Sequence, residues 1–171
     1  ADALASTSIV AVGRSMEPFR IGNLEFDARG PWVMGVLNVT PDSFSDGGRF
    51  DDPGRAFEQA RRMVAEGADL IDVGGESTRP ASREVGAEEE ASRVVGVIRR
   101  IVGELSVPVS IDTRKAAVAR AAIDAGASLV NDVSLLRHDP ALLGVVAAAE
   151  VPIVLMHSRG TPADMREHAR Y

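Results

Sequence analysis

Short apolar runs that alternate with helix-like segments constrain the fold of this chain more than any other feature. Five such runs, each rich in valine, isoleucine or leucine, occupy residues 32–37, 69–73, 107–111, 128–131 and 151–156. Each run is too short for a helix and has the continuous apolar character of a buried parallel strand. Alternation of such runs with helices is typical of a parallel α/β fold.

Four helices are predicted between the runs, and their starts are marked by capping chemistry. They begin at Asp52-Pro53, at Glu88-Glu89-Glu90, near Arg114 and at Asp139-Pro140, and glycines at 67 and 126 end the first and third. Acidic residues suit the positive end of a helix dipole. We therefore interpret the three glutamates as a helix start and not as a metal cluster, since consecutive carboxylates on a helix point in different directions.

The residues before the first run have a different character. Residues 1–18 are small and irregular and predict an N-terminal tail. Residues 19–26 alternate apolar and polar side chains around Gly22-Asn23, a pattern typical of a β-hairpin with a tight turn.

Polar residues follow nearly every predicted strand. They are Asn38, residues 76–79, residues 112–114, Asn131-Asp132 and His157. In a (β/α)8 barrel all these strand ends meet at one face, where active sites lie. A doubly wound sheet is the alternative, but no G-x-G-x-x-G loop follows the first strand. We predict the barrel, with one domain over residues 19–171.

The number of units is smaller than a closed barrel requires. About five β/α units are present, whereas a (β/α)8 TIM barrel has eight strands and typically ~250 residues. The sequence therefore predicts an apparently incomplete barrel with an N-terminal β-hairpin, whose sheet stops before it can close.

Composition excludes several classes of function. The net charge of −6 and the pI near 5.1 argue against nucleic-acid binding, which needs a basic face. No apolar run approaches the ~18–20 residues that span a bilayer, so no membrane partner is expected. With no cysteine there is no disulfide framework and no thiolate metal site, and a cytoplasmic location is expected.

The segment GVLNVTPDSFSDGG at residues 35–48 is the most specific motif in the chain. It predicts a strand that ends at Asn38 and continues into a loop with Asp42, Ser43 and Asp46. Hard oxygen ligands of this kind suit Mg²⁺ that is shared with substrate phosphates. A solvated turn is the alternative on composition alone.

Five sequence blocks in order resemble dihydropteroate synthases of the pterin-binding family. They are NVTPDSF with SDGG (38–48), GGESTRP (74–80), SIDT (110–113), NDVS (131–134) and LMHSRGTPADM (155–165). Each block stands at a predicted strand end, and together they run through most of the chain. The resemblance implies a transferase of folate biosynthesis that joins 6-hydroxymethyl-7,8-dihydropterin diphosphate to p-aminobenzoate and releases diphosphate, with sulfonamides as competitors.

The resemblance also implies roles for individual residues. Asn38 would bind Mg²⁺. Asp112 and Asn131 would hydrogen-bond the pterin, and Val133 and Met156 would pack on its faces. Thr78 and Arg79 would help hold phosphate or the mobile loops. Phe44 and Pro80 would shape the p-aminobenzoate site, and Asp46 would help complete the site when its loop closes. Asp46, Arg79 and Asp112 are the expected catalytic residues. A homodimer is expected for the full-length protein.

Plainer roles stay open for several of these residues. Asp112 would also serve as a helix cap, Asn131 as a strand-end amide, Met156 as core packing and Arg79 as a loop charge. His157 is interpreted as structural. Ala81 stands where the family commonly has glycine, and the family's later lysine and arginine-histidine blocks have no counterpart, so we expect the isolated chain to be inactive. A non-catalytic pterin binder and a pterin-binding methyltransferase are the alternative functions.

Overall fold

The computed structural model describes residues 18–27, 31–40, 53–77 and 84–156. These residues form seven strands and four helices: β1 (Phe19–Ile21), β2 (Leu24–Phe26), β3 (Met34–Asn38), α1 (Pro53–Ala65), β4 (Leu70–Gly74), α2 (Ala87–Glu104), β5 (Val109–Asp112), α3 (Ala116–Asp124), β6 (Leu129–Asp132), α4 (Ala141–Ala149) and β7 (Ile153–Leu155). The five apolar runs thus become β3 to β7, each within about two residues of its predicted bounds. The predicted tail, apart from Pro18, lies outside the described residues.

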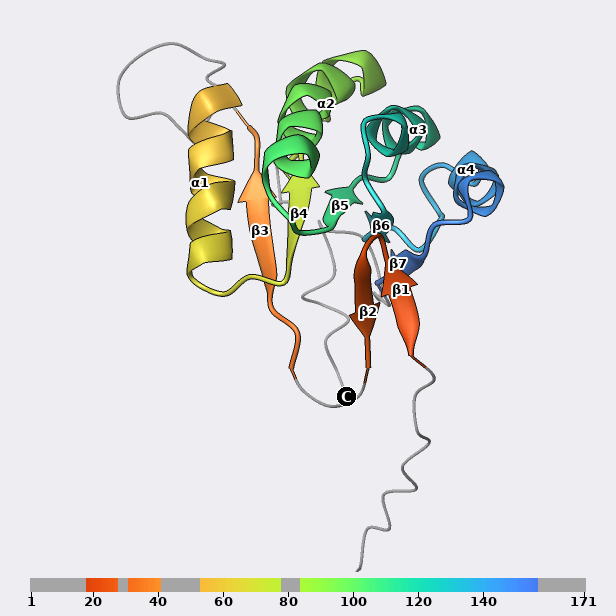
Figure 1. The fold of residues 1–171 in the computed structure, drawn as a ribbon. Helices are drawn as coiled ribbons and strands as arrows, with labels where there is room; N and C mark the ends of the chain where they lie inside the picture. The colour runs from red at the N-terminus through yellow and green to blue at the C-terminus, as the bar shows by residue number, and fades with distance from the viewer. Residues whose placement is uncertain (1–17, 28–30, 41–52, 78–83, 157–171) are drawn as a thin grey trace, which may run out of the picture.

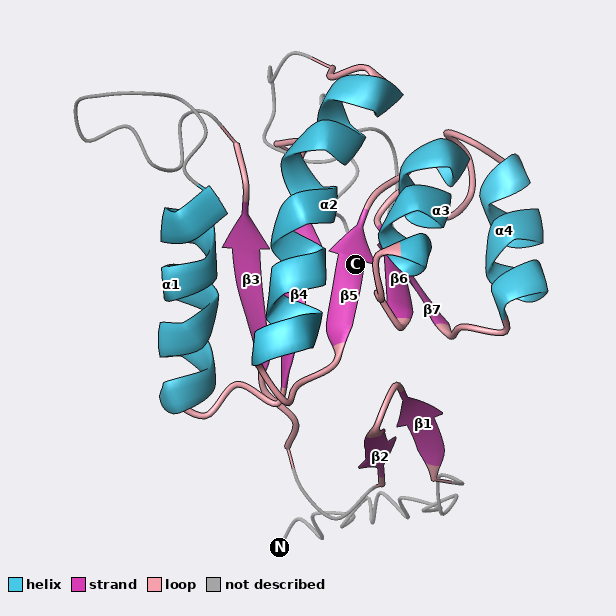
Figure 2. Cartoon of the chain, turned by 45° about the horizontal axis from the view of Figure 1, so that its top comes forward, coloured by secondary structure: helices cyan, strands magenta, loops and turns pink. Residues whose placement is uncertain are grey.

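The sheet topology is that of a barrel and not of a doubly wound sheet. Strands β3 to β7 are parallel and lie in the order of the chain, β3-β4-β5-β6-β7. Helices α1 to α4 all cover the same face of this sheet (Figures 1 and 2). A doubly wound sheet reverses its strand order and places helices on both faces, so the described units match consecutive (β/α) units of an incomplete TIM barrel.

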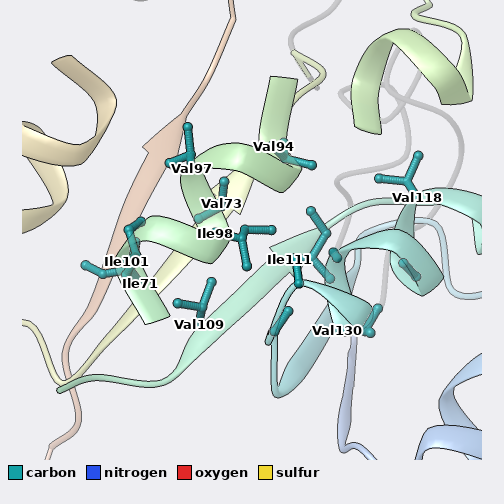
Figure 3. Packing of buried hydrophobic residues seen from close by; sticks show 14 of the residues in the cluster. Ile71, Val73, Val94, Val97, Ile98, Ile101, Val109, Ile111, Val118 and Val130 are labelled. Carbon is teal, nitrogen blue, oxygen red and sulfur yellow. The ribbon is translucent and has the colours of Figure 1, made fainter. Parts of the chain in front are cut away.

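The helix-facing side of the sheet forms the main hydrophobic core. Leu37, Val73, Ile111 and Val130 occupy paired positions on adjacent strands and are almost completely buried. Helix α2 packs on them through a stripe of buried residues at helical spacing: Val94, Val97, Ile98 and Ile101 (Figure 3). This core fixes which face of each strand is turned away from the helices.

The predicted hairpin is confirmed. It covers the N-terminal end of the sheet face that is turned away from the helices. Strands β1 and β2 pair antiparallel, with Gly22 in a left-handed conformation (φ 58°) at the turn. Ile21 and Phe26 form a second hydrophobic cluster with Leu70 and Leu129, which lie near the starts of β4 and β6. Figure 2 shows the hairpin beneath the N-terminal ends of the parallel strands, far from their C-terminal ends.

The predicted helix starts are confirmed for α2 and α4. Glu88, Glu89 and Glu90 occupy the first turn of α2, and the Asp139 carboxylate accepts the Ala141 amide at the start of α4 at 3.1 Å. Capping of α3 was the plainer alternative role for Asp112, but the first turn of that helix is bonded by a remote side chain instead. The Ala116 amide donates to Asp139 Oδ2 at 2.8 Å, so one aspartate serves the first turns of two helices.

Candidate functional site

Three predicted site residues lie at one level across adjacent strands. Asn38 pairs with Gly74 of β4, Gly74 pairs with Asp112 of β5, and Asp112 pairs with Asn131 of β6. Residues paired in this way project from the same face of a sheet, and here it is the face turned away from the helices. The structure therefore gathers Asn38, Asp112 and Asn131 at the C-terminal edge of the sheet.

Gly74 leaves open the space between the first two of these side chains. A methyl group placed on Gly74 would lie 3.6 Å from Asn38 Oδ1 and 3.5 Å from Asp112 Oδ2. Two oxygen atoms from strands that are not neighbours thus border the same small space. Because the intervening strand carries no side chain here, a ligand or a cation has room to meet both oxygens.

Asp112 is held in an environment that favours its protonated form. Burial is the main cause, and the negative charges of Asp72, Glu90 and Asp132 add to it, opposed by Arg114. Together they raise the pKa of the Asp112 carboxyl to about 7. A carboxyl whose pKa lies near neutrality at a strand end is typical of a functional site.

Asn131 is oriented by a buried carboxylate beneath it. Its Nδ2 donates to Asp72 Oδ2 at 3.0 Å, and Asp72 is only 3% exposed. This bond fixes the amide so that Nδ2 points down toward Asp72 and Oδ1 is left for another donor. Asp72 Oδ1 and Ser110 Oγ are the buried side-chain atoms without a hydrogen-bond partner among the described residues, and they lie at paired positions just below the site.

Val133 and Met156 follow the ends of β6 and β7, beside this layer. Val133 is half-buried, and Met156 is 39% exposed. The exposure of Met156 shows that it is not a core residue of the described fold. Its amide donates to the Asp132 carbonyl at 3.1 Å, which ties the two strand ends together.

A buried ion cluster behind the site was not foreseen from the sequence. Lys115 Nζ donates to Glu76 Oε2 and to Glu90 Oε2, at 2.5 Å each, and Thr113 Oγ1 donates to Glu90 Oε1 at 2.6 Å. Arg114 Nη2 adds a bond to Glu76 Oε1 at 2.9 Å. The cluster joins the ends of β4 and β5 to helix α2.

The electrostatics of this cluster favour the ionised forms of Lys115 and Glu76. Burial opposes ionisation of Lys115 and Glu76, but hydrogen bonds and charges outweigh it. The two glutamates raise the pKa of Lys115, and Lys115 and Arg114 lower the pKa of Glu76. Glu90 was interpreted as part of a helix start, which is correct, but its side chain is fully buried and also binds Lys115.

Five predicted site residues lie outside the described residues: Phe44, Asp46, Thr78, Arg79 and Pro80. His157 lies outside them as well. Among the described residues no group of three or more histidine, cysteine or acidic side chains is placed to hold a metal ion. None of the described helices is both long enough and apolar enough to cross a membrane.

Parallel β/α units in chain order, with polar side chains gathered where the strands end, define an enzyme of the TIM-barrel class. A family model described as "Pterin binding enzyme" matches residues 34–171. The chain therefore belongs to the family of pterin-binding enzymes.

Individual relatives carry a more specific name. The dihydropteroate synthase of Bacillus subtilis (strain 168) is 56% identical over 127 residues, which cover 74% of this chain and 45% of that protein. A Yersinia pestis dihydropteroate synthase solved as a sulfonamide drug complex superposes with a TM-score of 0.80 at 44% identity and covers 91% of this chain and 56% of that one.

A dihydropteroate synthase from Xanthomonas albilineans, solved with 4-aminobenzoic acid, gives a TM-score of 0.77 at 47% identity over 83% of this chain and 52% of that one. The chain spans about half the length of the Bacillus subtilis protein and of two further curated dihydropteroate synthases that it matches.

Proposed function

We propose that this protein is a dihydropteroate synthase, which joins 6-hydroxymethyl-7,8-dihydropterin diphosphate to p-aminobenzoate and releases diphosphate. The observation that carries the proposal is the layer of Asn38, Asp112 and Asn131 around Gly74. Relatives at 44–56% identity that bear this name support it. The solved relatives with a sulfonamide and with 4-aminobenzoic acid support p-aminobenzoate as the second substrate and sulfonamides as competitors.

The pterin ring would be recognised by the polar groups of β5 and β6. A pterin presents a row of N–H donors and ring acceptors along one edge. In its ionised form the Asp112 carboxylate would accept N–H bonds from the ring. Asn131 Oδ1 would accept a further one, because its Nδ2 is engaged by Asp72. Val133 and Met156 would pack against the flat faces of the ring.

The reaction needs stabilised charges and alignment but no covalent enzyme intermediate. The aniline nitrogen of p-aminobenzoate attacks the pterin methylene, a C–N bond forms, the C–O bond to diphosphate breaks, and the amine loses a proton. Positive charge that develops on the pterin is stabilised by Asp112. Arg79 would hold the departing anion, and Thr78 would bind phosphate. Phe44 and Pro80 would line the p-aminobenzoate site, and Asp46 would complete the site. Alignment of the two substrates supplies much of the remaining acceleration.

The oxygen donors at the site fit Mg²⁺. Asn38 Oδ1 and Asp112 Oδ2 border the space over Gly74, and Mg²⁺ commonly binds through one or two protein oxygens while keeping waters and substrate phosphate oxygens as its other ligands. Asn38 would hold the ion. When bound, Mg²⁺ would supply charge stabilisation to the diphosphate. Dimerisation and a cytoplasmic location stay predictions.

Binding and turnover on the intact protein test this function. In a calorimetric titration, the protein should bind the pterin diphosphate weakly in EDTA and more tightly with Mg²⁺. Addition of p-aminobenzoate should then yield dihydropteroate, and a sulfonamide should compete with p-aminobenzoate. Asn131→Ala should weaken pterin binding, whereas the surface variant Arg61→Ala should not.

The alternatives give different results in the same assays. Pterin binding without product would identify a non-catalytic pterin binder. Methyl transfer from a methylated folate, without use of the diphosphate, would identify a methyltransferase. If the wild type binds the pterin diphosphate equally well in EDTA and with Mg²⁺, the role assigned to Asn38 is wrong.

A further inference from the structure

The side chain of one buried aspartate accepts two backbone amides of the turn after β6. Asp132 is fully buried, and both of its carboxylate oxygens accept backbone amides: Oδ1 from Ser134 at 2.7 Å and Oδ2 from Leu136 at 2.6 Å. A carboxylate that accepts two amides stabilises a turn that the backbone would not keep by itself.

The backbone of this turn is strained. Leu135 and Leu136 both have left-handed conformations, with φ of 55° and 60°. Residues other than glycine rarely adopt such angles, and bulky aliphatic side chains are among the least suited to them. Two in succession persist only where surrounding contacts determine them. The contacts here include the two bonds to Asp132, the bond from the Arg137 amide to the Ser134 carbonyl at 3.3 Å, and the packing of Leu136 on the main core.

Asp132 also connects the two residues expected on the pterin faces. Val133 is its direct neighbour, placed between the strand end and the strained turn. Met156 is held by the bond from its amide to the Asp132 carbonyl. The side chain of Asp132 itself projects on the helix side of the sheet, because it alternates with Asn131, so it does not line the site. Its charge acts on the site only by helping to raise the pKa of Asp112, an effect that a substitution at Leu135 leaves in place.

We propose that Asp132 is a positioning residue, which sets the separation of Val133 and Met156 and thereby the slot that accepts the flat pterin ring. The inference rests on the proposed function. Asp132 would not contact the substrate, and its effect would be on pterin affinity and not on p-aminobenzoate.

The first test measures the strain without any ligand. Asp132→Asn removes one of the two acceptors and should lower the urea midpoint of unfolding. Leu135→Gly tolerates the left-handed conformation, so it should recover part of this loss in the Asp132→Asn background. If Leu135→Gly changes the urea midpoint by the same amount in the wild type and in Asp132→Asn, the two residues are independent. Asp132 would then not hold the turn, and the proposal would be overturned.

The second test measures ligand binding on the intact protein. Asp132→Asn should weaken binding of the pterin diphosphate by about tenfold or more, since small misplacements of contact groups are costly, while the KM for p-aminobenzoate stays nearly unchanged. Leu135→Gly in the same background should restore part of the pterin affinity.

Asp139 provides a matched control. Its carboxylate also accepts two backbone amides, from Ala116 and Ala141, but at the starts of α3 and α4. Asp139→Asn should lower stability without a change in pterin affinity. Equal loss of pterin affinity in both variants would overturn the inference, whereas a wild-type protein that binds no pterin would overturn the proposed function itself.

Discussion

At the scale of single residues, the fold does not require glycine at position 74, but the proposed site does. An added methyl group would make only ordinary contacts, at 3.5 and 3.6 Å, and the backbone there is not left-handed. The same methyl group would occupy the space between Asn38 and Asp112. At the next residue, Gly75, it would lie 2.9 Å from Val94 Cγ1 and 3.0 Å from the Glu90 carbonyl oxygen, inside the packed core.

Gly74→Ala and Gly75→Ala should therefore fail in different ways. Gly74→Ala should fold with a free energy of unfolding within about 1 kcal/mol of the wild type and lose binding of pterin diphosphate and Mg²⁺. Gly75→Ala should lose about 1–3 kcal/mol of stability through overpacking. Calorimetric binding and urea denaturation of both variants decide the matter. Normal ligand affinity in Gly74→Ala would show that the space over Gly74 is not the site.

Asp112 couples function to stability through its titration. The pKa of its carboxyl is about 7 in the folded protein and near 3.8 in an unperturbed chain. Between these values the folded state holds a proton that the unfolded state has released, so ionisation of Asp112 weakens the fold as the pH rises from about 4 to 7. An asparagine at this position stays neutral throughout.

Asp112→Asn should consequently be more stable than the wild type at pH 8, by about 1–2 kcal/mol once partial solvent contact is allowed for. The difference should vanish toward pH 4, where the wild-type carboxyl is also neutral. The variant should bind pterin poorly, because it lacks the carboxylate. Urea denaturation at pH 4, 6 and 8 measures the effect, and a variant that is less stable than the wild type at pH 8 would contradict it.

At the scale of elements, the buried ion cluster joins two strand ends to helix α2. Lys115 lies between Glu76 and Glu90 and is only 8% exposed. Removal of one partner from a buried ion pair leaves an uncompensated charge behind. The cluster differs in this respect from the exposed pairs on the helix surfaces, such as Arg61–Glu58 on α1.

Lys115→Met should cost about 3–5 kcal/mol in the free energy of unfolding at pH 7, because it removes the cation from between two buried glutamates and Arg114 remains only beside Glu76. Arg61→Met, the control, should cost less than about 1 kcal/mol. The pKa of Glu76 is lowered from 4.5 in the folded protein, so its contribution is present above that pH and is lost as the pH falls. The deficit of Lys115→Met should thus shrink in acid. A deficit that grows in acid would contradict the assignment.

The elements were predictable because their signals are local. Apolar runs gave the five strands, and the Asp-Pro and triple-glutamate patterns gave the starts of α4 and α2. The Glu90–Lys115 pair was not predictable, since neither residue differs in sequence from an ordinary surface charge and only the packing of α2 on β5 buries them. The remote cap of α3 by Asp139 was missed for the same reason.

At the scale of the whole molecule, the sheet face that is turned away from the helices is apolar at one end and polar at the other. At the strand starts the hairpin covers Leu70 and Leu129, and at the strand ends lie the polar groups of the site. The hairpin approaches closely at Gly22, where an added methyl group would lie 2.9 Å from Ser128 Oγ and 3.5 Å from Pro108 Cβ.

Gly22→Ala should destabilise the protein by about 1–2 kcal/mol, since the residue is left-handed and has no room for a side chain. Pterin affinity of the folded fraction should be unchanged, because the hairpin lies at the far end from the site. Gly96→Ala, inside α2 and in open space, is the control and should not destabilise the protein, since alanine favours a helix more than glycine does. A loss of affinity in Gly22→Ala would mean that the two ends of the molecule are coupled.

The gathering of the site could be predicted only in outline. Parallel strands in chain order bring their ends to one edge, which is why Asn38, Asp112 and Asn131 were expected together. The position of Gly74 between them, and the support of Asn131 by Asp72, follow from strand register, which no local pattern in a buried parallel strand specifies. Roles for residues 44, 46 and 78–80 stay predictions.

The common level of Asn38, Gly74, Asp112 and Asn131 sets a rule for insertions and deletions. One residue added or removed inside β4, β5 or β6 would move every later side chain of that strand to the other face of the sheet. Carboxylate and amide groups would then lie in the hydrophobic core under the helices. Changes in chain length between the strands leave this alignment intact. We therefore expect proteins built on this plan to vary in length at their connecting segments while the spacing within each strand stays constant.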